Sequence, residues 1–288
     1  AAAAIEAHWT AFFSSLANGS RILDIATGNG VLPVWALRAA RAEGHHFALT
    51  GVDLADIDPA RFLQEHADDL ADVRFRGNTP AEALPFDDDS FDVVVSQYGI
   101  EYAELAPALT EAARVLESGG QLHLLAHSHD SAVVLQGRER LRDIDLLLAP
   151  EGPFATMGAF VEAKARGRKL SRATRLLTEA LREAQQYCET HPPAPLVREL
   201  CGGILETANA FERYQPEDVA AWLEENRKRL LAQRQRVRDL LAARLTPARS
   251  AEVDGLLASG PWRDAHGETL TVGSTDVSVG RLISAYRR

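Results

Sequence analysis

A glycine-rich turn followed by an acidic residue is the part of the chain best suited to chemistry. Residues 23–30 read Leu-Asp-Ile-Ala-Thr-Gly-Asn-Gly between an apolar run and a helical pattern, and Asp53 closes the next apolar run. Glycines at a strand-to-helix turn let a ligand approach the backbone at the positive end of the helix. A carboxylate at the end of the second strand is suited to binding two ribose hydroxyls. The pattern predicts a nucleotide-like ligand at Gly28, Asn29 and Gly30.

The residue at the third glycine position of the motif distinguishes between two kinds of ligand. Both a dinucleotide and S-adenosylmethionine (SAM) fit the pair Gly28 and Gly30. The dinucleotide fingerprint Gly-x-Gly-x-x-Gly needs a third glycine where the helix packs tightly on the strand, and this chain has Pro33 there. The sequence therefore disfavours a dinucleotide.

Alternating strand and helix patterns must position this turn. Short apolar runs predict strands at Arg21–Ile25, Phe47–Val52, Val73–Phe75, Phe91–Ser96 and Gln121–Ala126. Helical spacing predicts helices at Val31–Ala42, Pro59–Leu70 and Glu104–Leu116, the last with Gly119-Gly120 as its C-cap. This alternation is typical of βαβ units, so we expect an α/β fold with a doubly wound, Rossmann-like sheet.

Helical periodicity replaces the strand signals after Asp130. We expect a large all-α insertion over 131–255, ending in a long helix at Glu217–Leu245 that Pro216 begins. Phe160–Cys188 is the expected antiparallel partner of that helix. A homodimer through the helical insertion is the alternative to a monomer.

Both ends of the chain also show patterns. Glu268–Val272 and Val277–Tyr286 predict a C-terminal β-hairpin around Gly273-Ser274-Thr275-Asp276, with Arg281–Tyr286 rejoining the sheet. The α/β domain is therefore expected over 1–130 and 256–288. The amphipathic segment Ile5–Leu16 predicts a helix, on which His8 and Trp9 either close over the ligand site or pack.

Charge and composition exclude several classes of protein. The chain has 31 basic and 41 acidic residues, net −10, which argues against a protein that binds along the nucleic-acid backbone. Residues 131–245 hold 19 Lys and Arg against 16 Asp and Glu, net +3, so the remainder carries −13. No apolar run is long enough for a membrane span. Cys188 and Cys201 form no disulfide framework, so we expect buried thiols and a cytoplasmic setting.

A longer motif strengthens the SAM interpretation. Residues 77–99 read Gly-Asn-Thr-Pro-Ala-Glu-Ala-Leu-Pro-Phe-Asp-Asp-Asp-Ser-Phe-Asp-Val-Val-Val-Ser-Gln-Tyr-Gly, and Glu-Ala-Ala-Arg-Val-Leu-Glu-Ser-Gly-Gly-Gln-Leu-His-Leu begins at residue 111. With Asp24, Gly28, Gly30 and Asp53 before them, these segments resemble the class I SAM-dependent methyltransferases. Within that class they resemble the ubiquinone/menaquinone C-methyltransferases and many small-molecule methyltransferases. The resemblance covers about residues 20–128.

The resemblance implies a set of residues around SAM. They are Asp24, Ala26, Gly28, Asn29, Gly30, Asp53, Leu54, Asn78, Thr79, Ala81, Glu82, Ser96 and Gln97. Asp24 would hold the amino group of SAM, and Asp53 the ribose hydroxyls. Pro80 stands where the family usually has a polar residue, so either Asn78 or a nearby backbone amide would read the adenine. Ala26 replaces a glycine that is frequent in the family.

Four residues after the predicted strands are candidates for catalysis. Tyr98, Glu101, His127 and His129 could take a proton from a hydroxyl acceptor, although a polar loop is the alternative for the two histidines. His-x-His lacks a third ligand, so no metal site is expected. Asp92 is expected to form a structural hydrogen bond.

The expected function is methyl transfer from SAM to O or C of a small-molecule acceptor, with the helical insertion closing over that acceptor. The Asn/Asp-Pro-Pro-Tyr/Phe signature of many amino-group methyltransferases is absent after the fourth predicted strand. Six basic residues between 164 and 175 leave an RNA-modifying enzyme as an alternative, but no aromatic residue there could stack on bases. A non-catalytic scaffold that assembles through the long helix is the other alternative.

Overall fold

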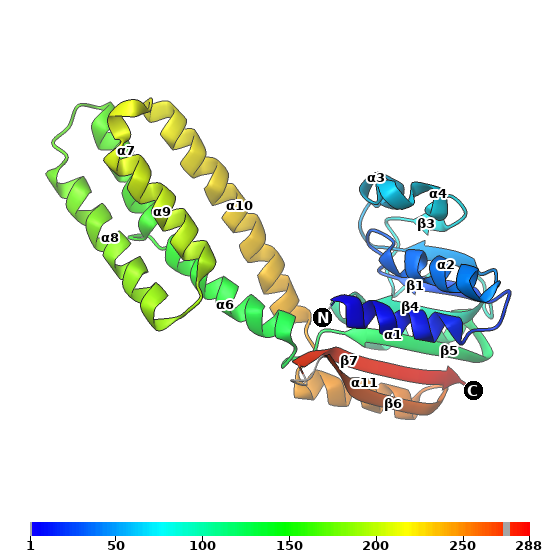
Figure 1. Cartoon of the computed structure of the whole chain (residues 1–288). Coiled ribbons are helices and arrows are strands. Elements are labelled where there is room, and N and C mark those ends of the chain that lie inside the picture. Colours follow the sequence, from blue (N-terminus) through cyan, green and yellow to red (C-terminus); the bar gives the residue numbers. More distant parts are fainter. Residues whose placement is uncertain (1, 273–276) are drawn as a thin grey trace. The chain divides into compact units, whose positions relative to one another are not determined.

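The computed structural model describes residues 2–272 and 277–288 and divides into two compact units (Figure 1). The α/β unit comprises Ala1–Val134 and Ala243–Arg288, and the helical unit comprises Leu135–Ala242. By this division, residues 243–255 belong to the α/β unit, although the sequence pattern placed them in the insertion. The expected hairpin turn at 273–276 lies outside the described residues.

Seven strands form one sheet within the described residues. They are β1 (Arg21–Ile25), β2 (Ala48–Val52), β3 (Arg74–Arg76), β4 (Phe91–Gln97), β5 (Leu116–Ala126), β6 (Trp262–Val272) and β7 (Val277–Arg287). Their order is β3-β2-β1-β4-β5-β7-β6, with β1 to β5 parallel. β7 lies antiparallel beside β5, which confirms the predicted return of the chain to the sheet (Figure 1). The doubly wound α/β fold is thus confirmed.

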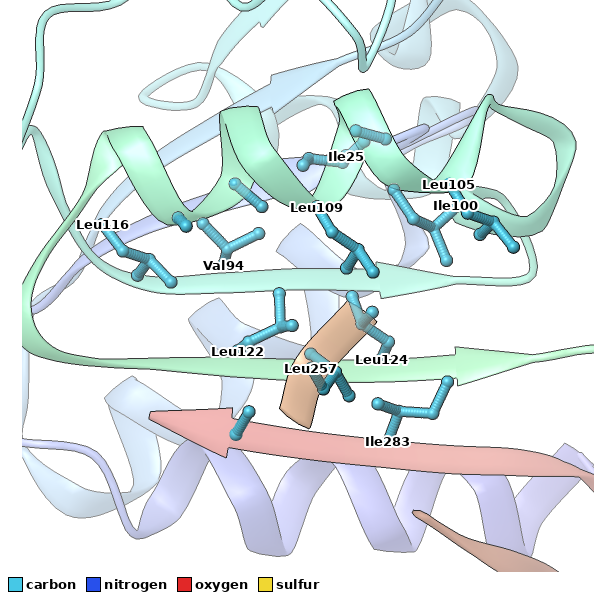
Figure 2. Packing of buried hydrophobic residues seen from close by; sticks show 14 of the residues in the cluster. Ile25, Val94, Ile100, Leu105, Leu109, Leu116, Leu122, Leu124, Leu257 and Ile283 are labelled. Atoms are coloured by element: carbon cyan, nitrogen blue, oxygen red, sulfur yellow. The ribbon is translucent and has the colours of Figure 1, made fainter. Parts of the chain in front are cut away.

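Helices cover both faces of the sheet because side chains alternate along each strand. α1 (Ala2–Ser14) and α2 (Val31–Glu43) pack on the face that carries Ile22 and Val93. α5 (Leu105–Val115) and α11 (Pro247–Ser259) pack on the opposite face, which carries Leu23 and Val94. Figure 2 shows Leu109 of α5 directed toward the strands on this second face. The continuous apolar strands of a parallel sheet are therefore buried on both sides.

The predicted helix Pro59–Leu70 is wrong as a single element. The structure has α3 (Pro59–Phe62), a 3-10 turn at Gln64–His66, and α4 (Ala67–Leu70). Leu63 leaves the helical conformation at φ −109° and ψ 59°, and Phe62 is 64% exposed. The segment lacks a continuous apolar stripe that would hold one helix against the sheet.

The predicted C-cap at Gly119-Gly120 is also wrong. α5 ends at Val115, and Leu116 is already extended and pairs with Phe91. Both glycines lie in β5, where the register with β4 shifts. Gly119 has φ +84°, so these glycines serve an irregular strand start rather than the end of a helix.

The helical unit is built mainly from five helices in the described chain. They are α6 (Ala132–Leu147), α7 (Pro153–Ala165), α8 (Ser171–Thr190), α9 (Pro195–Asn209) and α10 (Pro216–Ala243). Pro216 begins α10, as predicted. The expected partner Phe160–Cys188 is not one helix, because the chain turns at Gly167, which has φ +59°. None of the described helices is long and apolar enough to cross a membrane.

α10 packs against several helices of its own unit. Arg234 forms an ion pair of 2.6 Å with Asp145 of α6. The ring of Trp222 stacks on Phe154 of α7, with 6.4 Å between ring centroids. Of the two thiols, Cys188 is buried and Cys201 is partly exposed.

The chain leaves and re-enters the α/β unit at one place. The backbone N–H of Leu245 donates to His127 O at 2.7 Å, and His129 N donates to Leu245 O at 3.0 Å. Ser128 and Leu245 form a parallel bridge. The helical unit is therefore inserted between two neighbouring points of the sheet.

Candidate functional site

A cavity of about 490 Å³ lies at the carboxyl ends of β1, β2 and β4. Strand order reverses beside β1, and ligands of open α/β sheets bind at such switch points. Nine predicted cofactor residues line the cavity: Asp24, Ala26, Gly28, Asp53, Leu54, Thr79, Ala81, Glu82 and Gln97. Asn29, Gly30, Asn78 and Ser96 are not among its wall residues. The wall also contains Thr27, Val31, Leu32, Pro80, Tyr98, Gly99, Tyr102 and Ala103.

Asp24 contributes a buried carboxylate to the cavity wall. The residue is 3% exposed, and neither carboxylate oxygen has a hydrogen-bond partner among the described residues. Burial raises the pKa of Asp24 to about 7 against the opposing effect of the neighbouring Thr27 hydroxyl, and the charge of Asp53 acts in the same direction as burial. A buried carboxylate without a partner is costly unless a ligand pairs with it. This wall position therefore fits a cationic group such as the ammonium of SAM.

Other polar atoms around Asp24 are also buried without partners in the described structure. They are Thr27 Oγ1, Ser96 Oγ and Gln97 Oε1. Thr27 and Gln97 belong to the cavity wall. Unsatisfied groups gathered at one cavity indicate a polar ligand that completes their hydrogen bonds.

Asp53 joins the turn after β1 to the loop after β2. Its Oδ2 accepts a hydrogen bond from Gly28 N at 2.8 Å, and its Oδ1 accepts one from Ala55 N at 2.9 Å. Thr79 N donates to the backbone O of Asp53 at 2.8 Å. Each carboxylate oxygen retains a free lone pair, so the side chain can also accept from ribose hydroxyls.

The two glycines of the turn have different roles. Gly28 has φ +53°, and an added Cβ would meet no atom within 4 Å. Gly30 begins α2 with φ +81°, and an added Cβ would lie 3.1 Å from the ring of Phe75. Gly28 therefore borders the cavity, whereas Gly30 allows close packing behind it.

Ala26 and Gly99 approach each other at the cavity wall. Ala26 has φ 57°, and a Cβ added to Gly99 would lie 2.3 Å from the Ala26 Cβ. Any side chain at residue 99 would therefore clash with the methyl group of residue 26 unless the backbone shifts. Sequence reasoning missed Gly99, and the available signal was a glycine two residues after the fourth strand.

The loop that follows β3 is held in place by α5. Arg114 donates to Leu84 O at 2.9 Å and to Phe86 O at 2.7 Å. Glu111 Oε2 accepts from Leu84 N at 2.8 Å. These contacts anchor residues 84–86 of the motif to α5. The anchored residues in turn position the preceding segment 79–82 at the cavity.

Three of the four catalytic candidates lie together. His127 Nδ1 and His127 N both lie 2.8 Å from Glu101 Oε1, and Glu101 is 1% exposed in the 3-10 turn Ile100–Tyr102. The ring of Tyr98 meets that of His127 edge-on, with 4.1 Å between centroids. Only Tyr98 of these three lines the cavity. The side chain of His129 is 46% exposed and lies 3.8 Å from Asp130.

The environment of Tyr98 makes it a poor proton acceptor. Its hydroxyl donates to Val279 O at 2.9 Å. Burial, together with the charge of Glu101, raises the pKa of Tyr98 to about 12. The phenol therefore stays protonated at neutral pH.

Two other residues considered from the sequence lie outside the cavity wall. His8 and Trp9 of α1 contact His123 of β5 instead, with His8 Nε2 3.0 Å from His123 Nε2. Asp92 accepts from the backbone and guanidinium of Arg21, which confirms its structural role.

Residues 4–138 match the model of the ubiE/COQ5 methyltransferase family. This part of the chain is similar to class I SAM-dependent methyltransferases, and within them to the ubiquinone C-methyltransferases, as the sequence motifs indicated. SAM is the cofactor of that kind of domain.

Individual relatives match the same part of the chain. The ubiquinone/menaquinone biosynthesis C-methyltransferase UbiE of Idiomarina loihiensis is 36% identical over 128 residues, which cover 42% of this chain and 48% of the relative. The protein of the same name from Geobacter sulfurreducens is 30% identical over 148 residues, covering 49% and 55%. The chain thus spans about half the length of these relatives.

A solved SAM-dependent methyltransferase from Mesorhizobium loti is also similar. It has 23% sequence identity and a TM-score of 0.35, and the match covers 42% of this chain and 54% of that one.

Proposed function

We propose that the chain transfers a methyl group from SAM to an oxygen or carbon atom of a small-molecule acceptor. The observation that carries the proposal is the buried Asp24 carboxylate, which lines the cavity without a partner among the described residues. A cationic ligand would stabilise it where water does not reach. The family match supports SAM as the ligand that supplies this cation.

Four parts of the cavity wall would hold SAM. Asp24 pairs with the ammonium group, and Asp53 accepts hydrogen bonds from the ribose hydroxyls. Gly28 leaves room for the methionine part, and segment 79–82 borders the adenine. Bound SAM supplies a methyl group that its sulfonium charge already activates. The chain's own task is to align the acceptor with that methyl group and to exclude water.

We assign the proton-accepting role to His127 and a positioning role to Glu101. Glu101 Oε1 accepts from the Nδ1–H of His127, which leaves Nε2 of the neutral ring as the acceptor atom. Tyr98 keeps its proton and forms the part of the cavity wall next to His127. This assignment favours an acceptor with an acidic O–H or an activated C–H group.

We assign selection of the acceptor to the helical insertion, acting in a monomer or in a homodimer. The match to the family model ends at residue 138, just after the helical unit begins. The residues that would hold SAM all lie before that point. Acceptor recognition by the part of the chain beyond the matched segment is consistent with this separation.

Binding and transfer can be tested separately. Calorimetry of the full chain with SAM and S-adenosylhomocysteine (SAH) should detect one site, and its absence would refute the cofactor assignment. Methyl-labelled SAM with a metabolite extract should yield a labelled small molecule, identified as O- or C-methylated by mass spectrometry and NMR. Label found only in RNA would contradict the small-molecule proposal.

A variant pair tests the proton acceptor. His127→Gln should lower kcat at least 100-fold and leave SAH affinity within twofold, since His127 lies outside the cavity wall. Glu101→Gln should lower kcat less than His127→Gln does and leave KM unchanged, because the histidine loses the carboxylate that orients its ring. His129→Gln is the control and should retain full activity.

A further inference from the structure

We propose that the helical unit contains a binding site for an uncharged, apolar small molecule between α7 and α10. A cavity of about 660 Å³ separates these two helices, and every residue of its wall belongs to the helical unit. The proposal concerns a part of the chain that the SAM site does not use, and it does not depend on methyl transfer.

The cavity has the size and the surface of a ligand site. Small-molecule pockets typically have volumes of about 300–1,000 Å³ and predominantly apolar walls. The apolar wall residues are Leu148, Ala149, Pro150, Phe154, Ala155, Gly158, Val161, Ala165, Pro216, Ala220, Leu223 and Leu231. Phe154 and Leu223 are at most 7% exposed, so they form a rigid floor in the core of the unit.

Four of the five charged residues of the described cavity wall have an ion-pair partner within the protein. Arg227 pairs with Glu224 at 2.8 Å on α10. Arg166 pairs with Glu162 at 2.6 Å on α7.

The two remaining charged residues of the wall differ from each other. Arg234 pairs with Asp145 at 2.6 Å, and its buried Nε has no hydrogen-bond partner among the described residues. Glu217 is exposed in the first turn of α10, where the helix dipole favours a negative charge. Glu217 alone among the charged residues of the described wall has no ion-pair partner, so an anionic ligand would have to break an existing pair. This charge pattern disfavours an anionic ligand, and the apolar majority of the wall favours an uncharged one.

The surface around the cavity favours a small ligand over a second protein chain. The exposed large hydrophobic residues described in the helical unit are Leu135, Leu205, Tyr214 and Leu231. Only Leu231 belongs to the cavity wall. A stable protein interface buries about 1,200–2,000 Å² with an apolar centre, which one exposed leucine does not provide.

Two glycines provide a matched pair of variants. A Cβ added at Gly158 in the cavity wall, or at Gly202 in α9 outside it, would meet no atom within 4 Å. Leucine at either position removes a helix-interior glycine, so both variants should fold. Only Gly158→Leu places a side chain into the cavity. Ala220→Leu fills the cavity from the opposite helix.

The experiment titrates the full chain with N-phenyl-1-naphthylamine, an uncharged apolar fluorophore. We expect saturable binding of one molecule per chain. Gly158→Leu and Ala220→Leu should weaken binding at least tenfold, and Gly202→Leu should leave it within twofold. Decanol should displace the fluorophore at a concentration at least tenfold lower than decanoate, because only decanoate carries a charge.

Several results would overturn the proposal. One is the absence of saturable fluorophore binding. Another is an equal loss of affinity in the Gly158→Leu and Gly202→Leu variants. A third is displacement of the fluorophore by decanoate at the same concentration as by decanol. A dimer in light scattering that Gly158→Leu alone converts to monomer would assign the cavity to a second copy instead. Calorimetry with SAH separates the two proposals, since failure of SAH to bind refutes the proposed function and leaves the fluorophore result unchanged.

Discussion

The backbone N–H of Gly28 donates a hydrogen bond to the carboxylate of Asp53, with 2.8 Å between Gly28 N and Asp53 Oδ2. The same carboxylate accepts from Ala55 N. One side chain therefore connects the turns that follow two neighbouring parallel strands. Asp53 shapes the cavity in addition to any contact with a ligand.

Asp53→Ala should weaken SAH binding about 100-fold, because it removes both the ribose contacts and the support of the Gly28 turn. Asp53→Asn retains one carbonyl oxygen for the Gly28 N–H, so we expect a loss of about tenfold. Calorimetry measures both. Asp56→Ala, at an exposed position in the same loop, is the control and should bind normally. Unchanged affinity in Asp53→Ala would refute the cofactor assignment.

SAH affinity should fall as the pH decreases from 7.5 to 5.5. Burial raises the pKa of Asp24 to about 7, so the free protein protonates this carboxyl over that range. The ammonium of SAH binds the ionised form, and protonation therefore competes with binding by up to about tenfold per pH unit. Calorimetry in buffers of different ionisation enthalpy should detect proton release near pH 6. Asp24→Asn should bind weakly with no such pH dependence, and a flat wild-type profile would contradict the pairing.

Ala26 and Gly99 should be energetically coupled. Ala26→Gly relieves a left-handed backbone conformation and should raise the free energy of unfolding by about 0.5–1 kcal/mol. Gly99→Ala should lower it by about 1–3 kcal/mol, because the new methyl group meets the Ala26 Cβ. When Ala26→Gly is also present, the loss caused by Gly99→Ala should be smaller by at least about 1 kcal/mol. Urea denaturation of the four proteins measures the cycle, and additive effects would exclude the contact.

The contact between His8 and His123 should weaken in acid. Burial lowers the pKa of both imidazoles, that of His123 to about 3. His266 and Glu268 of β6 act on these rings with opposite signs, and Ser284 of β7 lies 2.8 Å from His123 Nδ1. The unfolded chain, with a histidine pKa near 6.5, binds protons first as the pH falls.

The contribution of this pair to the free energy of unfolding therefore has its full value above pH 6.5 and decreases below it. At pH 5.5 the loss should be on the order of 1–2 kcal/mol in the free energy of unfolding. The comparison of urea denaturation at pH 7.5 and 5.5 should show this loss in the wild type and a smaller one in His123→Gln. His46→Gln, at an exposed position, should behave as the wild type. A wild-type loss equal to that of His123→Gln would exclude the mechanism.

The strands and the two carboxylates at their ends could be predicted because the relevant signals are local. β1 follows from the apolar run Arg21–Ile25, and a parallel neighbour places Asp53 at the same edge as Asp24. The cavity contains both. The packing role of Gly30 could not be predicted from the same motif, because its partner Phe75 lies on a strand more than forty residues away.

Features that depend on distant partners could not be derived from local patterns. The Glu101–His127 pair exists because β5 and the turn Ile100–Tyr102 meet in the fold. The break at Leu63 depends on the absence of a buried stripe, which helical spacing alone does not reveal. Gly119-Gly120 resembled a helix end, but strand pairing of Leu116 with Phe91 determined the conformation.

The paired segments at His127–His129 and Leu245 have a consequence for the history of the chain. Their backbone hydrogen bonds hold the two ends of the helical unit at neighbouring points of the sheet. The entropic free-energy cost of closing such a loop rises only with the logarithm of its length, by about 0.6 kcal/mol for each doubling. Segments of very different length can therefore replace one another here while the sheet stays intact. Under the proposed assignment of acceptor selection to the helical unit, acceptor preference can diverge at this junction without a matching change in the part that would bind SAM.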